Sequence, residues 1–273
     1  MARLKSASAR RIRGKGFWPY WKYVVYAIFL VHLFLPAGAR AKDGQLPFAV
    51  GEKMTFQLRW GVICVGESSL EVLSGELNGN KVYHFAMTAT TNSFADIFYS
   101  VRDRVDAFAD LDMTHSLLYK KKQKEGSIER DITVQFDWDN NKAHYENLGR
   151  EERTISLKPG TFDPLSIFYY ARSLNLSEAS VPERPVTDGK KIVLGKAIIT
   201  RREKVRVPAG EFDTYVLEPN LKDISGVFEK SKKAKLELWL TADSRKLLVK
   251  MRSKVIVGSF IAELVAIEYG NSP

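Results

Sequence analysis

The chain has 273 residues, of which 45% are hydrophobic and 27% are charged. This composition is typical of a globular protein and excludes disordered and collagen-like classes. The formal net charge of +10 would suit a nucleic-acid-binding protein if the charge covered the folded surface. However, eight of the 42 cations lie in residues 1–41, which contain no Asp or Glu. The remaining 34 cations face 32 anions, so nucleic-acid binding loses its main support.

The first 41 residues have the three parts of a secretory signal peptide. A basic start is followed by an apolar run at 23–35 and then by Ala39 and Ala41, which precede Lys42. Small residues at the first and third positions before the cut are what signal peptidase accommodates. We therefore expect cleavage after Ala41 and a protein exported to the periplasm.

An uncleaved membrane anchor is the alternative for the same segment. Aromatic residues extend the apolar character of this segment upstream of residue 23. In this alternative, residues 17–39 would anchor the protein to the inner membrane. A spanning helix needs about 20 apolar residues, whereas the apolar run has 13 residues before Pro36. In both cases the basic flank stays in the cytoplasm and the rest of the chain, residues 42–273, crosses the membrane.

From residue 50 onward, alternating and β-branched runs recur between turn signals, a pattern typical of an antiparallel β protein. Asn78-Gly79-Asn80 and Asp139-Asn140-Asn141 are turn sequences because Asn and Gly tolerate positive φ. The predicted strands are 53–60, 66–74, 81–90, 101–109, 115–123, 127–138, 142–148, 152–157, 190–195, 197–207, 211–219, 234–241, 246–254 and 256–269.

One helix is predicted after Lys42, at about 163–175. It begins with Asp163 as N-cap and Pro164 at the first helical position, a favourable start for a helix. We expect its apolar stripe of Leu165, Phe168, Tyr169 and Leu176 to face a sheet. The segment 177–189 reads as a loop or crossover, or as a linker between two domains. We favour a single domain, because the same strand rhythm continues after it.

The predicted fold is therefore mainly β: a large curved antiparallel sheet or barrel-like fold with the helix at about 163–175 packed against it. The segment 256–267 is apolar at both alternating sets of positions. Such a strand is covered on both faces, either by the helix or by a lumen filled with side chains or ligand.

Several short segments, in this order and spacing, resemble domain-of-unknown-function family 3108. They are VGEK at 50–53, WG at 60–61, VGE at 65–67, DPLS at 163–166, YAR at 170–172, PAGEF at 208–212, LWLTAD at 238–243 and GSFIAEL at 258–264. Leu247-Leu248 departs from the pattern, because a proline is expected there. The resemblance covers about 48–269 and implies an exported, β-barrel-like protein of Gram-negative envelopes. It carries no established activity, so it supplies no catalytic residues.

The sequence contains no recognisable catalytic or metal-binding constellation. His84, His115 and His144 lie in separate predicted strands without the closely spaced ligand pair that zinc sites usually show. Neither a Gly-x-Ser-x-Gly nucleophile elbow nor a glycine-rich phosphate loop is present. We therefore predict no catalytic residues, no metal and no cofactor, and any enzyme chemistry would have to be assembled from distant residues.

Charged residues of the predicted fold leave structural and binding interpretations open. Asp163 is most simply a helix cap. Arg172 is predicted to form an ion pair with a strand carboxylate, or alternatively to bind an anionic head group. The basic runs at 120–124 and 230–233 read as solvated turns or strand edges, or as contacts with lipid phosphates.

The many aromatic residues suggest a function, because barrels of this size often enclose a cavity for one apolar ligand. The segment 94–99 reads as a loop with exposed apolar residues near the mouth of such a cavity. The candidate ligand-binding residues are Phe94, Phe98, Tyr99, Phe168, Tyr169, Arg172, Trp239 and Phe260. The preferred hypothesis is a non-enzymatic periplasmic protein that binds a lipid or acyl chain. The alternatives are a structural or interaction module with an envelope-protein partner and, less favoured, a cell-wall hydrolase.

Overall fold

The computed structural model describes residues 46–177, 180–219, 235–255 and 258–270. The predicted signal peptide, its cleavage site at Ala39, Ala41 and Lys42, and the alternative anchor at 17–39 lie outside the described residues. So does the basic run at 230–233. The helices that are described are too short to span a membrane.

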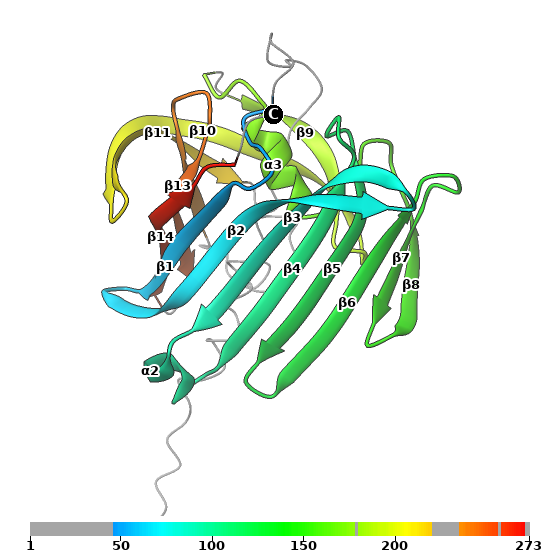
Figure 1. Ribbon diagram of the computed structural model, residues 1–273, viewed down its shortest axis with the longest axis horizontal. Coiled ribbons are helices and arrows are strands. Elements are labelled where there is room, and N and C mark those ends of the chain that lie inside the picture. Colours follow the sequence, from blue (N-terminus) through cyan, green and yellow to red (C-terminus); the bar gives the residue numbers. More distant parts are fainter. Residues whose placement is uncertain (1–45, 178–179, 220–234, 256–257, 271–273) are drawn as a thin grey trace, which may run out of the picture.

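Alternating apolar residues build the predicted strands, and the strands form one antiparallel sheet of fourteen (Figure 1). They are β1 (Lys53–Trp60), β2 (Ile63–Leu77), β3 (Asn80–Thr91), β4 (Val101–Ala109), β5 (Ser116–Glu125), β6 (Ile128–Asp137), β7 (Lys142–Asn147), β8 (Arg150–Ser156), β9 (Ser180–Thr187), β10 (Ile192–Val207), β11 (Gly210–Pro219), β12 (Lys235–Thr241), β13 (Leu248–Val255) and β14 (Gly258–Glu268).

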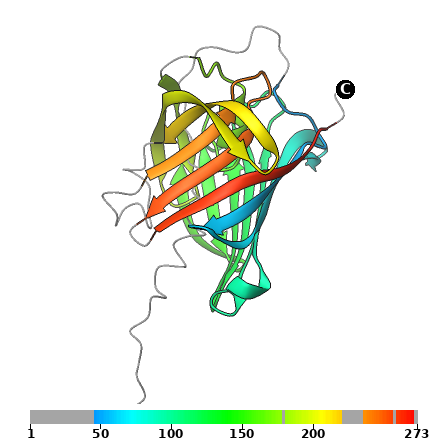
Figure 2. The ribbon, with the colours of Figure 1, turned by 90° about the vertical axis from the view of Figure 1, so that its left-hand side faces the viewer.

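The first and last strands of the chain pair with each other in the middle of the sheet. The order is β8-β7-β6-β5-β4-β3-β2-β1-β14-β13-β12-β11-β10-β9, so β8 and β9 are the two edges and the sheet is not closed. Figure 2 shows how strongly it curls: the C-terminal strands, yellow to red, lie across from the green strands β4 to β7. The prediction of a large curved antiparallel sheet with barrel-like shape is confirmed.

The chain after β8 partly covers the gap between the two edges. Phe162 forms a parallel bridge with Val186 of β9, because its N–H donates to the Pro185 carbonyl at 3.0 Å and its own carbonyl accepts from the Thr187 N–H at 2.9 Å. Near the other edge, Arg153 of β8 donates to the Lys190 carbonyl at 2.9 Å. The two edges therefore approach each other without forming a ladder.

The predicted helix is present as α3 (Ser166–Arg172), shorter than the expected 163–175. Asp163 caps it from outside, because its Oδ1 accepts from the N–H groups of Leu165 at 2.8 Å and Ser166 at 2.9 Å. A second helix of one turn, α2 (Ser93–Asp96), lies where the sequence predicted only a loop. It forms because the Asn92 side chain accepts from the N–H of Ala95 at 2.9 Å.

The segment 177–189 was expected to be a loop, and this expectation is wrong: it contains strand β9. Its two prolines, Pro182 and Pro185, argue against a central strand but are tolerated here, because β9 is an edge and needs donors on one side only. The neighbouring prediction of two strands at 190–195 and 197–207 is also wrong, since both belong to the continuous β10. A register shift between Gly195 and Ala197 marks their junction.

The last strand, β14, is covered less completely than the sequence suggested. Its inward residues Phe260, Ala262 and Leu264 are buried, whereas Ile261 and Val265 on the outer face are partly exposed. The inner face packs in the core, and long charged side chains partly cover the outer face. The apolar pattern therefore predicted the inner cover correctly but not the accessible outer face.

Candidate functional site

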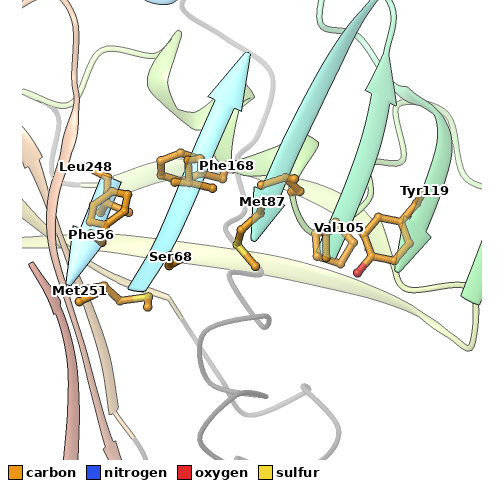
Figure 3. Close-up of a pocket in the computed structure, with 12 residues that line it drawn as sticks. Phe56, Ser68, Met87, Val105, Tyr119, Phe168, Leu248 and Met251 are labelled. Carbon is orange, nitrogen blue, oxygen red and sulfur yellow. The ribbon is translucent and has the colours of Figure 1, made fainter. Parts of the chain in front are cut away.

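An apolar pocket lies on the concave side of the sheet, between the sheet and α3 (Figure 3). Its cavity volume is about 40 Å³, and the space within it, including the open mouth, is about 560 Å³. Strands β1 to β5, the segment around α3, and strands β13 and β14 all contribute to it. The lining residues are Phe56, Ser68, Leu70, Met87, Val105, Tyr119, Pro164, Leu165, Phe168, Leu248, Met251 and Ala262.

A buried ion pair holds α3 in place at one end of the concave side. The Arg172 guanidinium is fully buried and donates to both carboxylate oxygens of Glu52, at 2.6 and 2.9 Å. It also donates to the carbonyls of Pro47 at 3.2 Å and Arg245 at 3.0 Å. This confirms the predicted ion pair, whose partner lies just before β1. Because both terminal nitrogens bind groups of the protein itself, Arg172 has a structural role at this end.

Aromatic packing fixes the face of α3 that does not reach the pocket. The ring of Tyr169 stacks on Phe85 with centroids 3.9 Å apart, and Phe48 contacts both rings edge-on. Burial raises the pKa of the Tyr169 hydroxyl. The helix is therefore rigidly seated, and Phe168, one position before Tyr169, lines the pocket.

Between the pocket and the α2 end of the sheet, the same concave face becomes polar. The buried side chains of Asp103 on β4 and of Lys121, Gln123 and Glu125 on β5 form what we call the inner polar cluster. Gln123 donates through Nε2 to Glu125 Oε1, and Asp103 Oδ1 accepts from the N–H of Lys124 at 2.9 Å. Three buried oxygens have no hydrogen-bond partner among the described residues: Asp103 Oδ2, Gln123 Oε1 and Glu125 Oε2.

Burial raises the pKa values of the carboxyl groups in this cluster and lowers the pKa of its lysine. It raises the pKa of Asp103. Together with the nearby charge of Asp103, it raises the pKa of Glu125 to about 8. It also lowers the pKa of Lys121 to about 8, although the two carboxyls oppose this change. Desolvation therefore dominates all three groups, which is typical of functional sites but also of structural networks.

A second charged network lies on the convex face, around Trp239 of β12. The buried Glu237 accepts from Arg201 at 3.0 Å and from Arg252 at 2.8 Å. Burial alone would raise the pKa of Glu237, but these hydrogen bonds outweigh it and lower the pKa. The guanidinium groups of Arg201 and Arg252 also stack over the Trp239 ring at 5.6 and 5.5 Å, and its Nε1 donates to Glu203 at 2.8 Å. The network is well paired.

The structure brings few of the predicted ligand-binding residues together. Of these, Phe168 alone lines the pocket. Tyr169 and Arg172 pack beside it in the core, Phe260 stacks on Trp60 with centroids 6.1 Å apart, and Trp239 lies on the opposite face of the sheet.

The remaining three predicted residues, Phe94, Phe98 and Tyr99, lie in and after α2, far from α3 (Figure 1), and do not line the pocket. Phe94 and Phe98 are about half exposed and contact each other edge-on with centroids 5.5 Å apart. Tyr99 instead packs beside Gly126, at the end of β5. The expectation of an exposed apolar segment at 94–99 therefore agrees with the structure, although ligand binding by it stays a prediction.

Sequence reasoning missed most of the site. Phe56, Met87, Val105 and Met251 were strand residues with no distinguishing pattern. The basic run at 120–124 was interpreted as a turn or edge, but β5 is a central strand and its Lys121 points inward. Because 120–125 is polar at every position, alternation could not show which residues face the concave side.

The three histidines among the described residues sit apart, each beside a carboxylate. His84 Nε2 lies 2.7 Å from Asp106, His115 Nδ1 lies 3.7 Å from Asp110, and His144 Nδ1 lies 3.1 Å from Glu151. Within the described part of the chain, no three His, Cys, Asp or Glu residues are grouped so that they could hold a metal ion.

The fold and pocket define a β-barrel-like protein with an apolar concave side. The chain belongs to the family described as protein of unknown function (DUF3108), which matches residues 55–265. No curated protein matches the chain.

Three solved structures are similar. A β-barrel-like protein of the domain-of-unknown-function family DUF1849 from Brucella abortus shares 12% identity over 82% of this chain and 99% of its own, with a TM-score of 0.54. A candidate lipoprotein from Parabacteroides distasonis shares 14% identity over 83% of this chain and 100% of its own, with a TM-score of 0.35. A candidate exported protein with a YmcC-like fold from Bacteroides fragilis shares 9% identity over 86% and 99%, also with a TM-score of 0.35. The first likeness supports the barrel-like fold.

Proposed function

We propose that this chain is a non-enzymatic protein of the bacterial envelope that binds the apolar part of an amphipathic component, such as a lipid or acyl chain, in the pocket beneath α3. The observation that carries the proposal is the open apolar pocket on the concave side. Its cavity volume of about 40 Å³ exceeds the roughly 10–15 Å³ that one water needs.

The chemistry of the lining supports an acyl chain over a compact polar ligand. Apart from Ser68 and the hydroxyl of Tyr119, the lining side chains are apolar. Ser68 already donates to the Thr88 carbonyl at 2.6 Å, so it offers no free donor to a ligand. Met87 and Met251 are flexible, polarisable side chains that can adapt to a chain of variable shape.

The predicted signal peptide supports the location in this proposal. Cleavage after Ala41 would release the folded part into the periplasm, whereas an anchor at 17–39 would keep it at the inner membrane. N-terminal sequencing of the protein from cells decides between them. Lys42 as the first residue supports export with cleavage, and an intact Met1 contradicts it.

Ligand binding is tested by native mass spectrometry of the full chain purified from cells without detergent, followed by titration with a fluorescent fatty acid. We expect a lipid-sized mass adduct, or uptake of the fatty acid. A protein that arrives empty and takes up no fatty acid contradicts the proposal.

A variant that fills the pocket sharpens the test. Val105→Phe adds an aromatic ring to the lining, so uptake should fall at least about tenfold, with a stability cost of about 1–3 kcal/mol. Lys120→Phe is the matched control, because Lys120 is exposed on the opposite face of the neighbouring β5. Equal uptake by both variants and the wild type would show that the fatty acid binds elsewhere.

An interaction module is the second candidate, and a different observation favours it. At the end of the sheet near α2, the turn between β1 and β2 exposes Val62 to 85%, and Ile97 beside α2 is exposed to 76%. The Asn92 side chain ties the two segments together by donating to the Cys64 carbonyl at 3.0 Å. Exposed apolar residues that gather at one end are typical of interaction sites. Photo-cross-linking from position 97 in cells, with recovery of one dominant envelope protein, would favour this function.

A further inference from the structure

The inner polar cluster begins where the apolar pocket ends. Successive same-face residues of a strand lie two positions apart, so Lys121, Gln123 and Glu125 continue the face on which Tyr119 lines the pocket. On β4, the same face continues from Val105 to Asp103, which is paired with Gln123. Neither strand has a register shift over these residues. An amphipathic molecule lying along the concave side would therefore pass from apolar to polar lining within two to four residues of these strands.

The polar atoms that await a partner in this cluster are all acceptors. Gln123 is 1% exposed and Glu125 is fully buried, yet Gln123 Oε1, Glu125 Oε2 and Asp103 Oδ2 have no partner among the described residues. Leaving a buried acceptor unsatisfied costs about 1–3 kcal/mol. Sequences that fold stably normally avoid this cost, so three such atoms on one face of two neighbouring strands call for an explanation.

Proton sharing explains only part of the cluster. Asp103 and Glu125 can pair with each other while one carboxyl keeps a proton, and burial favours that protonated form for both. The Gln123 carbonyl oxygen has no such alternative, because its own amide nitrogen is already bonded to Glu125. In this arrangement of the amide, a donor from a bound molecule would supply the missing partner of the Gln123 oxygen.

We propose that the inner polar cluster is a subsite for the head of the amphipathic ligand and that it selects heads that donate hydrogen bonds, such as hydroxyl or ammonium groups. This inference rests on the proposed function, because it assumes that the apolar pocket receives the chain of the same molecule. With one proton shared between Asp103 and Glu125, a head with acceptors alone would still meet the Gln123 carbonyl oxygen, which cannot donate to it.

Three probes with the same twelve-carbon chain test the proposal on the full-length protein. Monolauroyl glycerol carries hydroxyl donors, dodecylamine carries an ammonium group, and methyl laurate has no donor. We expect at least one of the first two to bind about tenfold or more tightly than methyl laurate, since one hydrogen bond to a charged group is worth that factor. The stronger of the two identifies the type of head.

Removing an acceptor should abolish this preference without removing chain binding. In Gln123→Leu, the donor-headed probe should lose most of its advantage, while the affinity for methyl laurate stays the same or rises. Lys122→Leu is the matched control, because Lys122 lies on the exposed face of the same strand and should leave all affinities unchanged. Asp103→Asn provides a second variant if Gln123→Leu does not fold.

The outcomes separate the inference from the proposed function. If no probe binds, the proposed function fails and the inference fails with it. If methyl laurate binds as tightly as the donor-headed probes, the pocket is supported and the head subsite is overturned. A loss of affinity for all three probes in Gln123→Leu would likewise overturn it, because that result describes a structural residue.

Discussion

Buried polar groups at the two ends of the concave side differ in how their hydrogen bonds are made. Near α3, the buried guanidinium of Arg172 meets both oxygens of Glu52 and two backbone carbonyls. Toward α2, Gln123 and Glu125 of the inner polar cluster each keep an oxygen without a partner among the described residues. The ion pair fixes the position of α3 through the two terminal nitrogens of Arg172, although its Nε has no partner among the described residues. Unsatisfied acceptors, by contrast, cost stability and persist where they have another use. We infer that the first end is built for rigidity and the second for binding.

The convex network around Trp239 strengthens this comparison. Glu237 is nearly as buried as Gln123, but the cations around it lower its pKa, whereas the pKa of Glu125 is raised. Burial by itself therefore does not make the inner polar cluster unusual. What distinguishes it is that three of its buried acceptor oxygens have no hydrogen-bond partner among the described residues.

The largest effect is expected from breaking the ion pair at α3. Arg172→Met leaves the buried Glu52 carboxylate without its partner, so the free energy of unfolding should fall by about 3–5 kcal/mol, as is usual for a broken buried pair. Urea unfolding measures it. The double variant Arg172→Met/Glu52→Leu should recover much of the loss, because both charges are then gone. No recovery would show that Glu52 is not the partner that matters.

The next effect concerns the opposite end and depends on pH. Because the pKa of Glu125 is raised to about 8 in the folded state, the unfolded chain loses this proton from about pH 4.5 upward while the folded chain keeps it. Glu125 therefore lowers stability progressively from about pH 4.5 to 8. Glu125→Gln should be stabilised relative to the wild type, increasingly so toward pH 8. Denaturant midpoints at pH 5 and pH 8 measure this, with the exposed Glu129→Gln as control. A difference independent of pH would contradict the raised pKa.

A smaller effect is expected on the convex face. Glu237→Ala removes the shared acceptor of Arg201 and Arg252. The side chains of these two arginines are 35% and 43% exposed. Water can solvate these arginines, so we expect a loss of about 1–2 kcal/mol and not the full cost of a buried pair. Thermal unfolding measures the change. A loss as large as that of Arg172→Met would remove the distinction between the two networks.

The smallest effect is expected for an exposed ion pair on the other face of the same strands, β10 and β11. Arg202 and Asp213 lie 2.6 Å apart, but their side chains are 57% and 43% exposed. Arg202→Ala should change the free energy of unfolding less than any of the variants above, because exposed ion pairs contribute little. Raising the salt concentration should reduce even this difference. A larger loss would point to the packing of Arg202 over the Tyr215 ring, at 5.4 Å.

The sequence alone determined most of the strands, because one face of each is apolar. Alternation places β1 at 53–60 and β4 at 101–109, the bounds that the structure has. Turn residues such as Gly79, with φ of 79°, mark hairpins by local chemistry. Asp163 and Pro164 predicted a helix here for the same local reason, although α3 begins only at Ser166, with Leu165 as its N-cap. The family resemblance was also carried by such short segments, and it is confirmed over residues 55–265.

Tertiary structure alone decided which residues share a site. In 235–241, Leu236, Leu238 and Leu240 alternate with Lys235, Glu237 and Trp239, but the alternation could not show that Glu237 and Trp239 of the second set are also buried, in one network. In 120–125, both sets are polar, so it could not show that Lys121 and Gln123 face inward. Arg172 finds Glu52 across 120 positions of sequence. Faces and partners of this kind are fixed when the sheet curls and β1 pairs with β14, because that packing creates the concave side on which they meet.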